Sequence, residues 1–215
     1  MKPILYNNWK SSCSWRIRIA LALKGIDYEY RPVNLAQKEQ RTPEYLKINP
    51  QGLVPVLNVG KKHLSESIAI MEYLEEKYPE KRRLLPMNPE DRAKVRSLTL
   101  LVAANIQPLQ NLKVREYYAK GDPEKLKEWA VHWVENGFDA LETELKKYSG
   151  KFAYGDNPTF VDTVIPPQVY NARDKFGLDM NKYPTIKAID ERLSTLEAVK
   201  KAHPNNQPDA PSGSH

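Results

Sequence analysis

The stretch at residues 11–18, SSCSWRIR, lies where a short apolar strand pattern gives way to an apolar-periodic helix. Ile4, Leu5 and Tyr6 precede it, and apolar residues at helical spacing follow from Ile17 onward. Backbone N–H groups at a helix N-terminus have no partner within the helix, and the helix dipole adds positive potential there. Hydroxyl and thiol side chains at such a junction therefore favour the binding of an anion.

Two interpretations fit Ser11, Ser12 and Cys13. In the structural one, a serine caps the helix and a small cysteine is buried beside it, which is the commoner use of these residues. In the functional one, a hydroxyl donates a hydrogen bond to a thiolate supplied by a cofactor. Lowering a thiol pKa from about 8.5 by ~2 units needs ~2.7 kcal/mol of preferential stabilisation. A hydrogen bond to a charged group contributes roughly 1.5–3 kcal/mol and a helix N-terminus roughly 0.3–1 kcal/mol, so no histidine or lysine base is required.

Composition and charge argue against several classes of protein. The chain has 215 residues, 40% of them hydrophobic, and no apolar run approaches the length of a membrane span. Its net charge is +6, from 33 Lys and Arg against 27 Asp and Glu, but the two signs alternate along the chain. Such alternation is typical of solvated helix faces and does not favour nucleic acid as a partner. A small anionic substrate fits the mild positive excess better.

The cysteine and histidine content argues against a disulfide framework and a metal centre. Cys13 is the only cysteine, so no disulfide can form within the chain, which suits a reducing, cytoplasmic location. The four histidines do not have metal-ligand spacing. The first residues enter a strand pattern at once and resemble neither a secretory signal nor a transit peptide. We expect a soluble intracellular protein without a bound metal.

Strand and helix patterns alternate over the first eighty residues. Their order predicts β-α-β-α-β-β-α, with a parallel pair across the first crossover and an antiparallel hairpin at the tight turn near Gly60. Ser65 is the predicted cap of the last of these helices. The strands are predicted at residues 3–7, 27–34, 54–59 and 63–64, and the helices at 15–24, at 43–47 and from 65 to about 78.

A stretch rich in proline and charge follows, and beyond it only helix patterns are found, at residues 90–119, 123–147, 160–175 and 184–201. Thr159 and Asp162 form a capping-box pattern at the start of the third of these helices. We therefore predict four parts. They are an α/β domain at 1–80, a linker at 81–89, an all-helical domain at 90–202 and an extended or disordered tail at 203–215.

Two further pairs of residues carry a structural and a functional interpretation. Val54-Pro55 is an ordinary strand entry, or a cis peptide that turns the backbone of Val54 toward a bound peptide. Glu66 and Ser67 cap a helix, or they hold the ammonium and carboxylate of a charged amino-acid head. Spacing alone favours the structural interpretation in both cases.

Five blocks of the sequence together carry a family resemblance. The most specific is SSCSWRIRIAL at residues 11–21. The others are NPxxxVP at 49–55, ESxAIxEYL at 66–74, IQPLQNL at 106–112 and HPxxQPD at 203–209. In this order they resemble the zeta class of cytosolic glutathione transferases, the maleylacetoacetate isomerase family, with one conservative change at Ile17 in the zeta signature. The resemblance runs over about residues 3–211.

The resemblance implies a thioredoxin-like N-terminal domain of the α/β class and an all-α C-terminal domain, the cytosolic glutathione transferase fold, usually as a homodimer. It also implies glutathione as the cofactor. Ser11 and Ser12 would face the glutathione sulfur, and Cys13 would lie beside them and shape the pocket for the second substrate. Val54, before a cis Pro55, would pair with the cysteinyl backbone of glutathione. Further glutathione contacts are implied for Glu66 and Ser67 at the γ-glutamyl end, and for Gln40, Gln107, Asn111, Leu112 and Lys113.

The implied reaction converts maleylacetoacetate to fumarylacetoacetate in tyrosine and phenylalanine catabolism. A glutathione thiolate adds to the cis double bond, the former double bond rotates, and elimination returns glutathione unchanged. Maleylpyruvate isomerases use the same motifs, so the acyl group is not fixed by these residues. Arg16 is a candidate for a substrate carboxylate contact or an internal pair, and we favour the internal pair.

The sequence departs from the family near the electrophile site, where an Arg usually stands just before the Phe of an Asn-Ala-x-Arg-Phe run. Here the run at residues 171–176 is one residue longer, so Arg173 or Lys175 could supply that cation. Glu66 stands where zeta members often have Gln, and Glu is the usual residue at this position in other transferase classes.

Three other functions compete with isomerisation. A detoxifying transferase, acting for example on α-halo acids, would share the site and keep the adduct. A non-enzymatic protein on a transferase scaffold is disfavoured by the intact Ser11 and Ser12. A thiol–disulfide oxidoreductase is disfavoured because no Cys-x-x-Cys is present, although Cys13 could support chemistry with one thiol.

Overall fold

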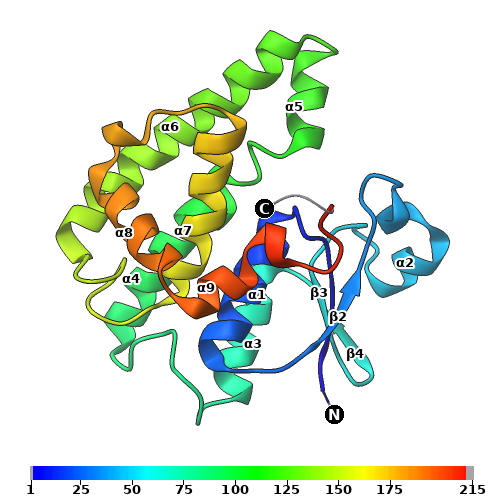
Figure 1. Ribbon diagram of the computed structural model, residues 1–215, viewed down its shortest axis with the longest axis horizontal. Helices are drawn as coiled ribbons and strands as arrows, with labels where there is room; N and C mark the ends of the chain where they lie inside the picture. Colours follow the sequence, from blue (N-terminus) through cyan, green and yellow to red (C-terminus); the bar gives the residue numbers. More distant parts are fainter. Residues whose placement is uncertain (1, 212–215) are drawn as a thin grey trace. The chain divides into compact units, whose positions relative to one another are not determined.

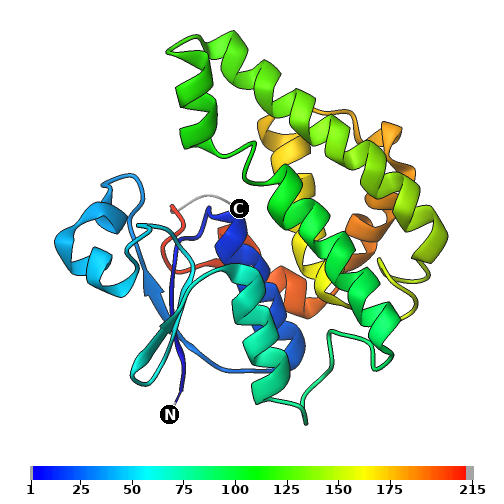
Figure 2. The ribbon, with the colours of Figure 1, turned by 180° about the vertical axis from the view of Figure 1, so that it is seen from behind.

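The computed structural model describes residues 2–211 and divides the chain into two compact units. The first comprises residues 1–83 and 196–215, and the second residues 84–195. The boundary after Arg83 falls inside the predicted linker. Figures 1 and 2 show a sheet with flanking helices in the first unit and helices alone in the second, as predicted.

A four-stranded mixed sheet, in the order β2-β1-β3-β4, forms the centre of the first unit. β1 pairs with β2 in parallel, whereas β1–β3 and β3–β4 are antiparallel. Both predicted pairings are confirmed, and so is the predicted order of elements. The strands are β1 (Ile4–Asn7), β2 (Glu29–Pro32), β3 (Val56–Val59) and β4 (Lys62–Leu64).

Helices α1 (Ser12–Lys24) and α3 (Ser67–Lys77) pack against each other in the first unit (Figure 1). α1 ends because Gly25 adopts a φ of 64°, a left-handed conformation that glycine takes without steric cost. The Nζ of Lys24 lies 2.9 Å from Oε2 of Glu75 and donates to the carbonyl of Arg82 at 2.9 Å. This buried ion pair joins the two helices at their C-terminal ends.

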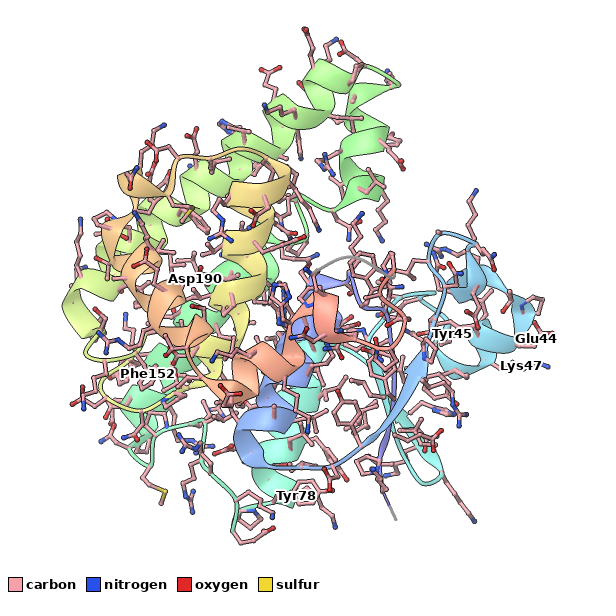
Figure 3. The ribbon with its side chains drawn as sticks, in the orientation of Figure 1. Glu44, Tyr45, Lys47, Tyr78, Phe152 and Asp190 are labelled. Carbon is pink, nitrogen blue, oxygen red and sulfur yellow. The ribbon has the colours of Figure 1, made fainter. Side chains whose placement is uncertain are left out.

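Helix α2 (Pro43–Ile48) lies on the side of the sheet away from α1 and α3 (Figure 1) and follows a short 3-10 turn at Glu39–Arg41. Tyr45 of α2, labelled in Figure 3, forms a buried apolar cluster with Val33 and Val56. Its hydroxyl donates to the carbonyl of Leu53 at 2.8 Å. The tyrosine thus anchors the loop that leads into β3.

The C-terminal segment differs from its prediction. Residues 197–202, expected at the end of the helical domain, form α9 (Glu197–Ala202), which packs against α1 in the first unit. Beyond it, a 3-10 turn at Pro204–Asn206 continues into a hydrogen-bonded segment in which Gln207 is buried. The part of the predicted tail at 203–211 is therefore folded, because its polar side chains bond backbone carbonyls. Residues 212–215 lie outside the described part of the chain.

The second unit consists of helices around a core that contains Phe138, Phe160 and Leu193. Among residues 2–211, no helix is both long and apolar enough to cross a membrane. The carboxylate of Glu142 accepts hydrogen bonds at 3.0 Å from the amides of Thr185 and Ile186, which begin the last helix. The helices are α4 (Pro89–Leu100), α5 (Leu112–Ala119), α6 (Pro123–Tyr148), α7 (Phe160–Tyr170) and α8 (Pro184–Ser194), with π-helical turns at Leu101–Ile106 and Asn171–Lys175 and a 3-10 turn at Met180–Lys182.

Three helices predicted as continuous are interrupted. The segment predicted as one helix at 90–119 breaks near Pro108, which lacks the N–H that an α-helix requires. The predicted helix at 184–201 breaks after Ser194, where the chain passes from the second unit to the first. The predicted helix at 160–175 ends in a π-helical turn, which accommodates one residue more per turn than an α-helix.

Candidate active site

The junction between β1 and α1 presents hydroxyl groups at a helix N-terminus. Ser11 is the N-cap, with φ −72° and ψ 118°, and its Oγ accepts a hydrogen bond from the amide of Ser14 at 3.2 Å. Ser12 and Cys13 follow as the first two helical residues and are partly exposed. The first turn contains no acidic residue, so no carboxylate of that turn neutralises the positive end of the helix dipole.

The capping role of Ser11 leaves its proton available. A serine hydroxyl has one O–H donor and two acceptor lone pairs, and the amide of Ser14 uses only a lone pair. Accepting a hydrogen bond polarises the O–H group and strengthens it as a donor. The capping part of the structural interpretation is therefore confirmed and is compatible with the functional one, whereas Cys13 is partly exposed and not buried as that interpretation expected. The cap holds a hydroxyl in place that can still donate to an anion.

The Val54–Pro55 peptide bond is cis. The loop before it is held at one atom, because the carbonyl of Leu53 accepts hydrogen bonds from Tyr45 Oη at 2.8 Å and Asn49 Nδ2 at 2.9 Å. Val54 itself packs against the Tyr45 cluster. The sequence-based role of Val54 in pairing with a bound peptide stays a prediction.

The start of α3 differs from its prediction. The N-cap is Glu66 and not Ser65, and its side chain makes no capping hydrogen bond. Glu66 is exposed and has a φ of 64°, which is uncommon for a residue with a side chain. Such backbone conformations cost about 1–3 kcal/mol and gather at functional sites. Glu66 and Ser67 are thus presented at a helix N-terminus whose first turn carries no other acid.

Arg16 connects α1 to the start of α3. Its side chain is almost wholly buried, with 2% of the residue exposed, and Nη1 donates to Oγ of Ser67 at 3.1 Å. Within residues 2–211, its buried Nε has no hydrogen-bond partner. The expected internal pair is therefore formed with a hydroxyl. Because Ser67 Oγ accepts this bond, its own proton stays available to a ligand.

Gln40 lies in the 3-10 turn at Glu39–Arg41, and its Oε1 is buried without a donor among the described residues. The backbone of this turn packs closely on Gly52, where a Cβ would lie 2.9 Å from the carbonyl oxygen of Gln40. Gly52 also has a φ of 61°. A larger residue would displace the turn that carries Gln40.

The predicted residues Gln107, Asn111, Leu112 and Lys113 belong to the second unit, at the break between its first two helical segments. Asn111 caps α5 by accepting a hydrogen bond from the amide of Lys113 at 3.2 Å. Leu112 is 53% exposed, which is unusual for a large apolar side chain. Their roles in glutathione binding stay predictions.

The two candidate cations near the electrophile site have different surroundings. Arg173 donates to the carboxylate of Asp174 at 2.9 and 3.2 Å and lies 3.7 Å from that of Asp190, which is labelled in Figure 3. Burial raises the pKa of Asp190 to about 6, and the charge of Arg173 opposes this rise. Lys175 lies over the ring of Tyr170, 5.7 Å from its centroid. Both cations lie in the π-helical turn at Asn171–Lys175.

Sequence reasoning missed the residues that hold the segment before Ser11. Arg18 is 1% exposed and bonds the carbonyls of Asn8 and Trp9, and Asp209 accepts from the amide of Trp9. The HPxxQPD block at 203–209 was the available signal, but we used it for the family resemblance and assigned it no structural contact, placing it in an extended or disordered tail.

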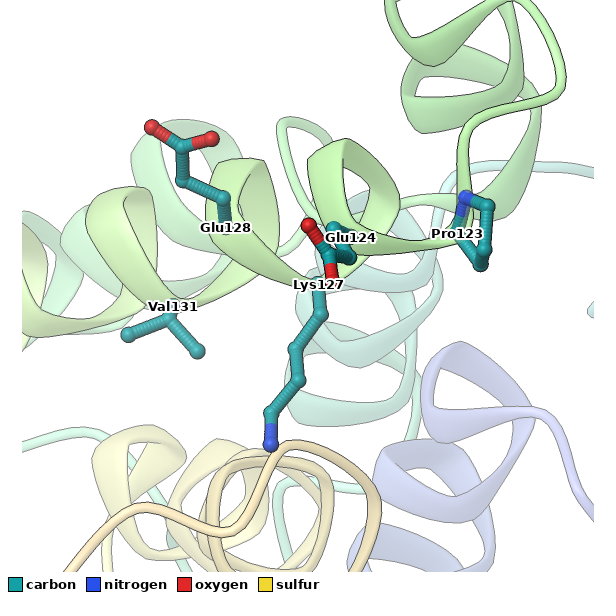
Figure 4. A pocket seen from close by; sticks show the side chains of 5 residues that line it. All are labelled: Pro123, Glu124, Lys127, Glu128 and Val131. Atoms are coloured by element: carbon teal, nitrogen blue, oxygen red, sulfur yellow. The ribbon is translucent and has the colours of Figure 1, made fainter.

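An open depression elsewhere on the surface includes none of these residues. Its lining comes from α6 alone and is shown in Figure 4: Pro123, Glu124, Lys127, Glu128 and Val131. Within residues 2–211, no group of three or more His, Cys, Asp or Glu side chains is arranged to hold a metal ion.

Comparisons with known proteins agree with these features. The N-terminal domain of glutathione S-transferase matches residues 1–76 and its C-terminal domain residues 109–202. A probable maleylacetoacetate isomerase of Caenorhabditis elegans is 48% identical over 97% of this chain and 96% of its own length. The maleylacetoacetate isomerase of Mus musculus is 46% identical over 98% and 96%.

Solved structures give the same result. A bacterial zeta-class maleylpyruvate isomerase superposes with a TM-score of 0.92 at 40% identity, over 97% of this chain and 100% of that one. A maleylacetoacetate isomerase of Anaeromyxobacter dehalogenans with glutathione in its active site superposes with a TM-score of 0.89 at 42% identity, over 98% of each chain. The chain therefore belongs to the glutathione transferase family and, within it, to the zeta class that contains the maleylacetoacetate isomerases.

Proposed function

We propose that this protein is a glutathione-dependent cis–trans isomerase whose substrate is maleylacetoacetate. The observation that carries the proposal is the β1–α1 junction, where the capping hydroxyl of Ser11 lies at a helix N-terminus without an acidic first turn. Relatives that share 43–48% of this sequence over nearly its whole length bear the isomerase name.

The first unit fits glutathione in three respects. The buried Oε1 of Gln40 needs a donor, which a peptide amide offers. The hydroxyl of Ser67, beside the buried guanidinium of Arg16, suits the α-carboxylate of the γ-glutamyl group. Glu66 would hold the ammonium of that group, and Val54 would pair with the cysteinyl backbone. The roles of Gln107 and residues 111–113 in glutathione binding are implied by the family resemblance alone.

When bound, glutathione supplies a thiolate that adds to the cis double bond of the substrate and leaves again after rotation to the trans form. The chain has to keep that sulfur ionised. Ser11 would do this by donating a hydrogen bond from its hydroxyl to the sulfur while its oxygen accepts the hydrogen bond from the amide of Ser14. The N-terminus of α1 would add its dipole, and Ser12 and Cys13 would line the same place.

The carboxylates of the second substrate need a cation, and Arg173 and Lys175 are the two candidates for this role. The guanidinium of Arg173 already bonds Asp174 with two of its nitrogens and lies beside Asp190. A charge held by two carboxylates attracts a third weakly.

Maleylpyruvate is the second candidate substrate, because a bacterial maleylpyruvate isomerase superposes on this chain with a TM-score of 0.92. We further infer, from the resemblance, a homodimer that acts in the cytoplasm on tyrosine and phenylalanine breakdown products. The lone Cys13 fits such a reducing compartment.

A direct test mixes the protein with glutathione and maleylacetone and follows both the absorbance of the double bond and the total thiol. Isomerisation changes the absorbance and leaves the thiol concentration constant, whereas a transferase that retains the adduct consumes thiol. Loss of thiol in step with the absorbance change would refute the isomerase proposal. Absence of both changes, together with no retention on immobilised glutathione, would indicate a non-enzymatic protein.

A further inference from the structure

Residues 8–10 connect β1 to Ser11, and side chains from outside this segment form hydrogen bonds with its backbone. Nη1 of Arg18 donates to the carbonyl of Asn8 at 3.2 Å and Nη2 to that of Trp9 at 2.9 Å. The amide of Ser11 in turn donates to the carbonyl of Asn8 at 3.1 Å. The position of Ser11 therefore depends on how this segment is fixed.

The amide of Trp9 donates to Oδ2 of Asp209 at 3.0 Å, across 200 positions in the sequence. The other oxygen of the same carboxylate, Oδ1, accepts a hydrogen bond from the hydroxyl of Tyr30 on β2. Asp209 thus ties the segment before Ser11 to the edge strand of the sheet. A carboxylate is well suited to this because each oxygen can accept independently.

The C-terminal segment that carries Asp209 is itself fixed to the first unit. Nε of Arg18 donates to the carbonyl of Ala202 at 3.1 Å, so one guanidinium bonds both the end of α9 and residues 8–9. Nε2 of Gln207 donates to the carbonyls of Lys201 and His203 at 2.9 and 2.8 Å. The ring of His203 also meets that of Trp15 edge to face, with centroids 5.1 Å apart.

We propose that Asp209 is a positioning residue for the sulfur site, which acts by holding Trp9 and Tyr30 so that Ser11 keeps its place at the N-terminus of α1. This inference rests on the proposed function, in which the hydroxyl of Ser11 donates a hydrogen bond to the sulfur of glutathione. A hydrogen bond to a thiolate weakens when its donor is displaced, because its strength depends steeply on distance and angle. Removal of the Asp209 carboxylate should therefore raise the pKa of the bound thiol.

The test compares Asp209→Ala with a matched control, Glu197→Ala. Glu197 is also an acid of the C-terminal segment, but its side chain is 88% exposed and pairs with the nearby Lys200 at the surface. The first readout is amide hydrogen exchange of residues 9–11 without any ligand. We expect about tenfold faster exchange in Asp209→Ala and no change in Glu197→Ala, because the lost bond has a charged acceptor.

The second readout is the thiolate absorbance of bound glutathione as a function of pH. We expect its apparent pKa to rise by about 0.5 unit or more in Asp209→Ala, which corresponds to a roughly threefold smaller ratio of thiolate to thiol in the pH range below that pKa. Tyr30→Phe, which removes only one of the two hydrogen bonds of Asp209, should give a smaller shift of the same sign. This variant also tests the inference if Asp209→Ala does not fold.

The control for a general loss of stability is Val134→Ala, a variant that removes buried methyl groups from α6, which belongs to the second unit. It should lower the melting temperature and leave the thiol pKa unchanged. The inference is overturned if Asp209→Ala has the thiol pKa of Glu197→Ala, whether or not its exchange is faster. If wild-type protein does not ionise glutathione at all, the proposed function fails, while the exchange measurement still decides whether Asp209 holds residues 9–11.

Discussion

Replacing Ser11 with alanine should damage stability and chemistry by separate, calculable amounts. The first loss comes from the helix cap, because Ser11 Oγ accepts the amide of Ser14 at 3.2 Å. Replacing a serine N-cap by alanine typically costs about 1 kcal/mol. In a chain of 215 residues this corresponds to a fall in melting temperature of about 2–4 °C.

The second loss concerns the thiolate. A hydrogen bond to a charged group contributes about 1.5–3 kcal/mol, which equals about 1–2 units of thiol pKa. If the bound thiol has a pKa of about 6.5, about three quarters of it is ionised at neutral pH. A rise of 1–2 units would leave roughly a quarter to a few per cent ionised, so the turnover number at neutral pH should fall about 3-fold to 25-fold. At high pH, where the thiol ionises without help, part of the activity should return.

The assay is an ultraviolet titration of the glutathione complex, paired with a thermal melt of the free protein. Ser11→Thr keeps the hydroxyl and should restore both properties in large part, whereas Ser12→Ala should leave the melting temperature unchanged because Ser12 is not the cap. If Ser11→Ala melts earlier but ionises glutathione like the wild type, Ser11 is only a cap, and the reasoning about its proton is wrong.

Three further predictions concern other parts of the molecule. Arg16→Met removes a buried charge together with the hydrogen-bond donor to Ser67. The dissociation constant of glutathione, measured by calorimetry, should therefore rise about tenfold, while the melting temperature of the ligand-free protein should not fall. An unchanged dissociation constant would contradict this. Gly137→Ala would place a Cβ 2.2 Å from Cγ1 of Ile106, so urea unfolding should show a loss of about 1–2 kcal/mol despite the better helix propensity of alanine, and a gain in stability would disprove the overlap. Because burial raises the pKa of Asp190 to about 6, its contribution to stability is complete below its ordinary pKa of 3.8 and is lost as pH rises through about 6. Asp190→Asn should remove up to ~3 kcal/mol of this loss of stability with rising pH. The measurement is the difference in the free energy of unfolding between wild type and variant, taken below pH 3.8 and above about pH 6. If that difference does not depend on pH, burial does not shift the pKa of Asp190.

Sequence patterns predicted those elements whose determining residues lie within or next to the element itself. The strand order and both pairings followed from apolar alternation and from loop lengths that allow either a crossover or a hairpin. A serine cap was one of two interpretations of residues 11–13, because a serine before an apolar-periodic run satisfies the first amides of a helix. The helix was predicted from residue 15, whereas α1 begins at Ser12 and Ser11 is its cap. The capping residue of α3 was misassigned because Ser65 matches the usual cap chemistry, whereas Glu66 begins the helix with a positive φ that no local pattern indicates.

Features that depend on distant partners were not predictable in this way. The tail at 203–211 has the polar, proline-rich composition of a disordered segment, yet its side chains bond backbone groups of α9 and of residues 8–10. The partner of Arg16 likewise lies 51 residues away and is a hydroxyl rather than an acid. Composition reports the average preference of a segment, and a few specific hydrogen bonds to distant groups outweigh it here.

α1 is the element through which these distant contacts reach the sulfur site. Its first residues carry the hydroxyls that we propose face the thiolate, Arg16 extends from its second turn to Ser67, and Arg18 extends from the same helix to the C-terminal segment. A rigid helix transmits displacement along its length, so a change at one of these contacts moves the groups at the others. Affinity for the γ-glutamyl end and ionisation of the sulfur should therefore be coupled. In a double-mutant cycle, Arg16→Met and Asp209→Ala should together raise the thiol pKa by an amount that differs from the sum of their separate effects, and strict additivity would show that α1 does not connect the two sites.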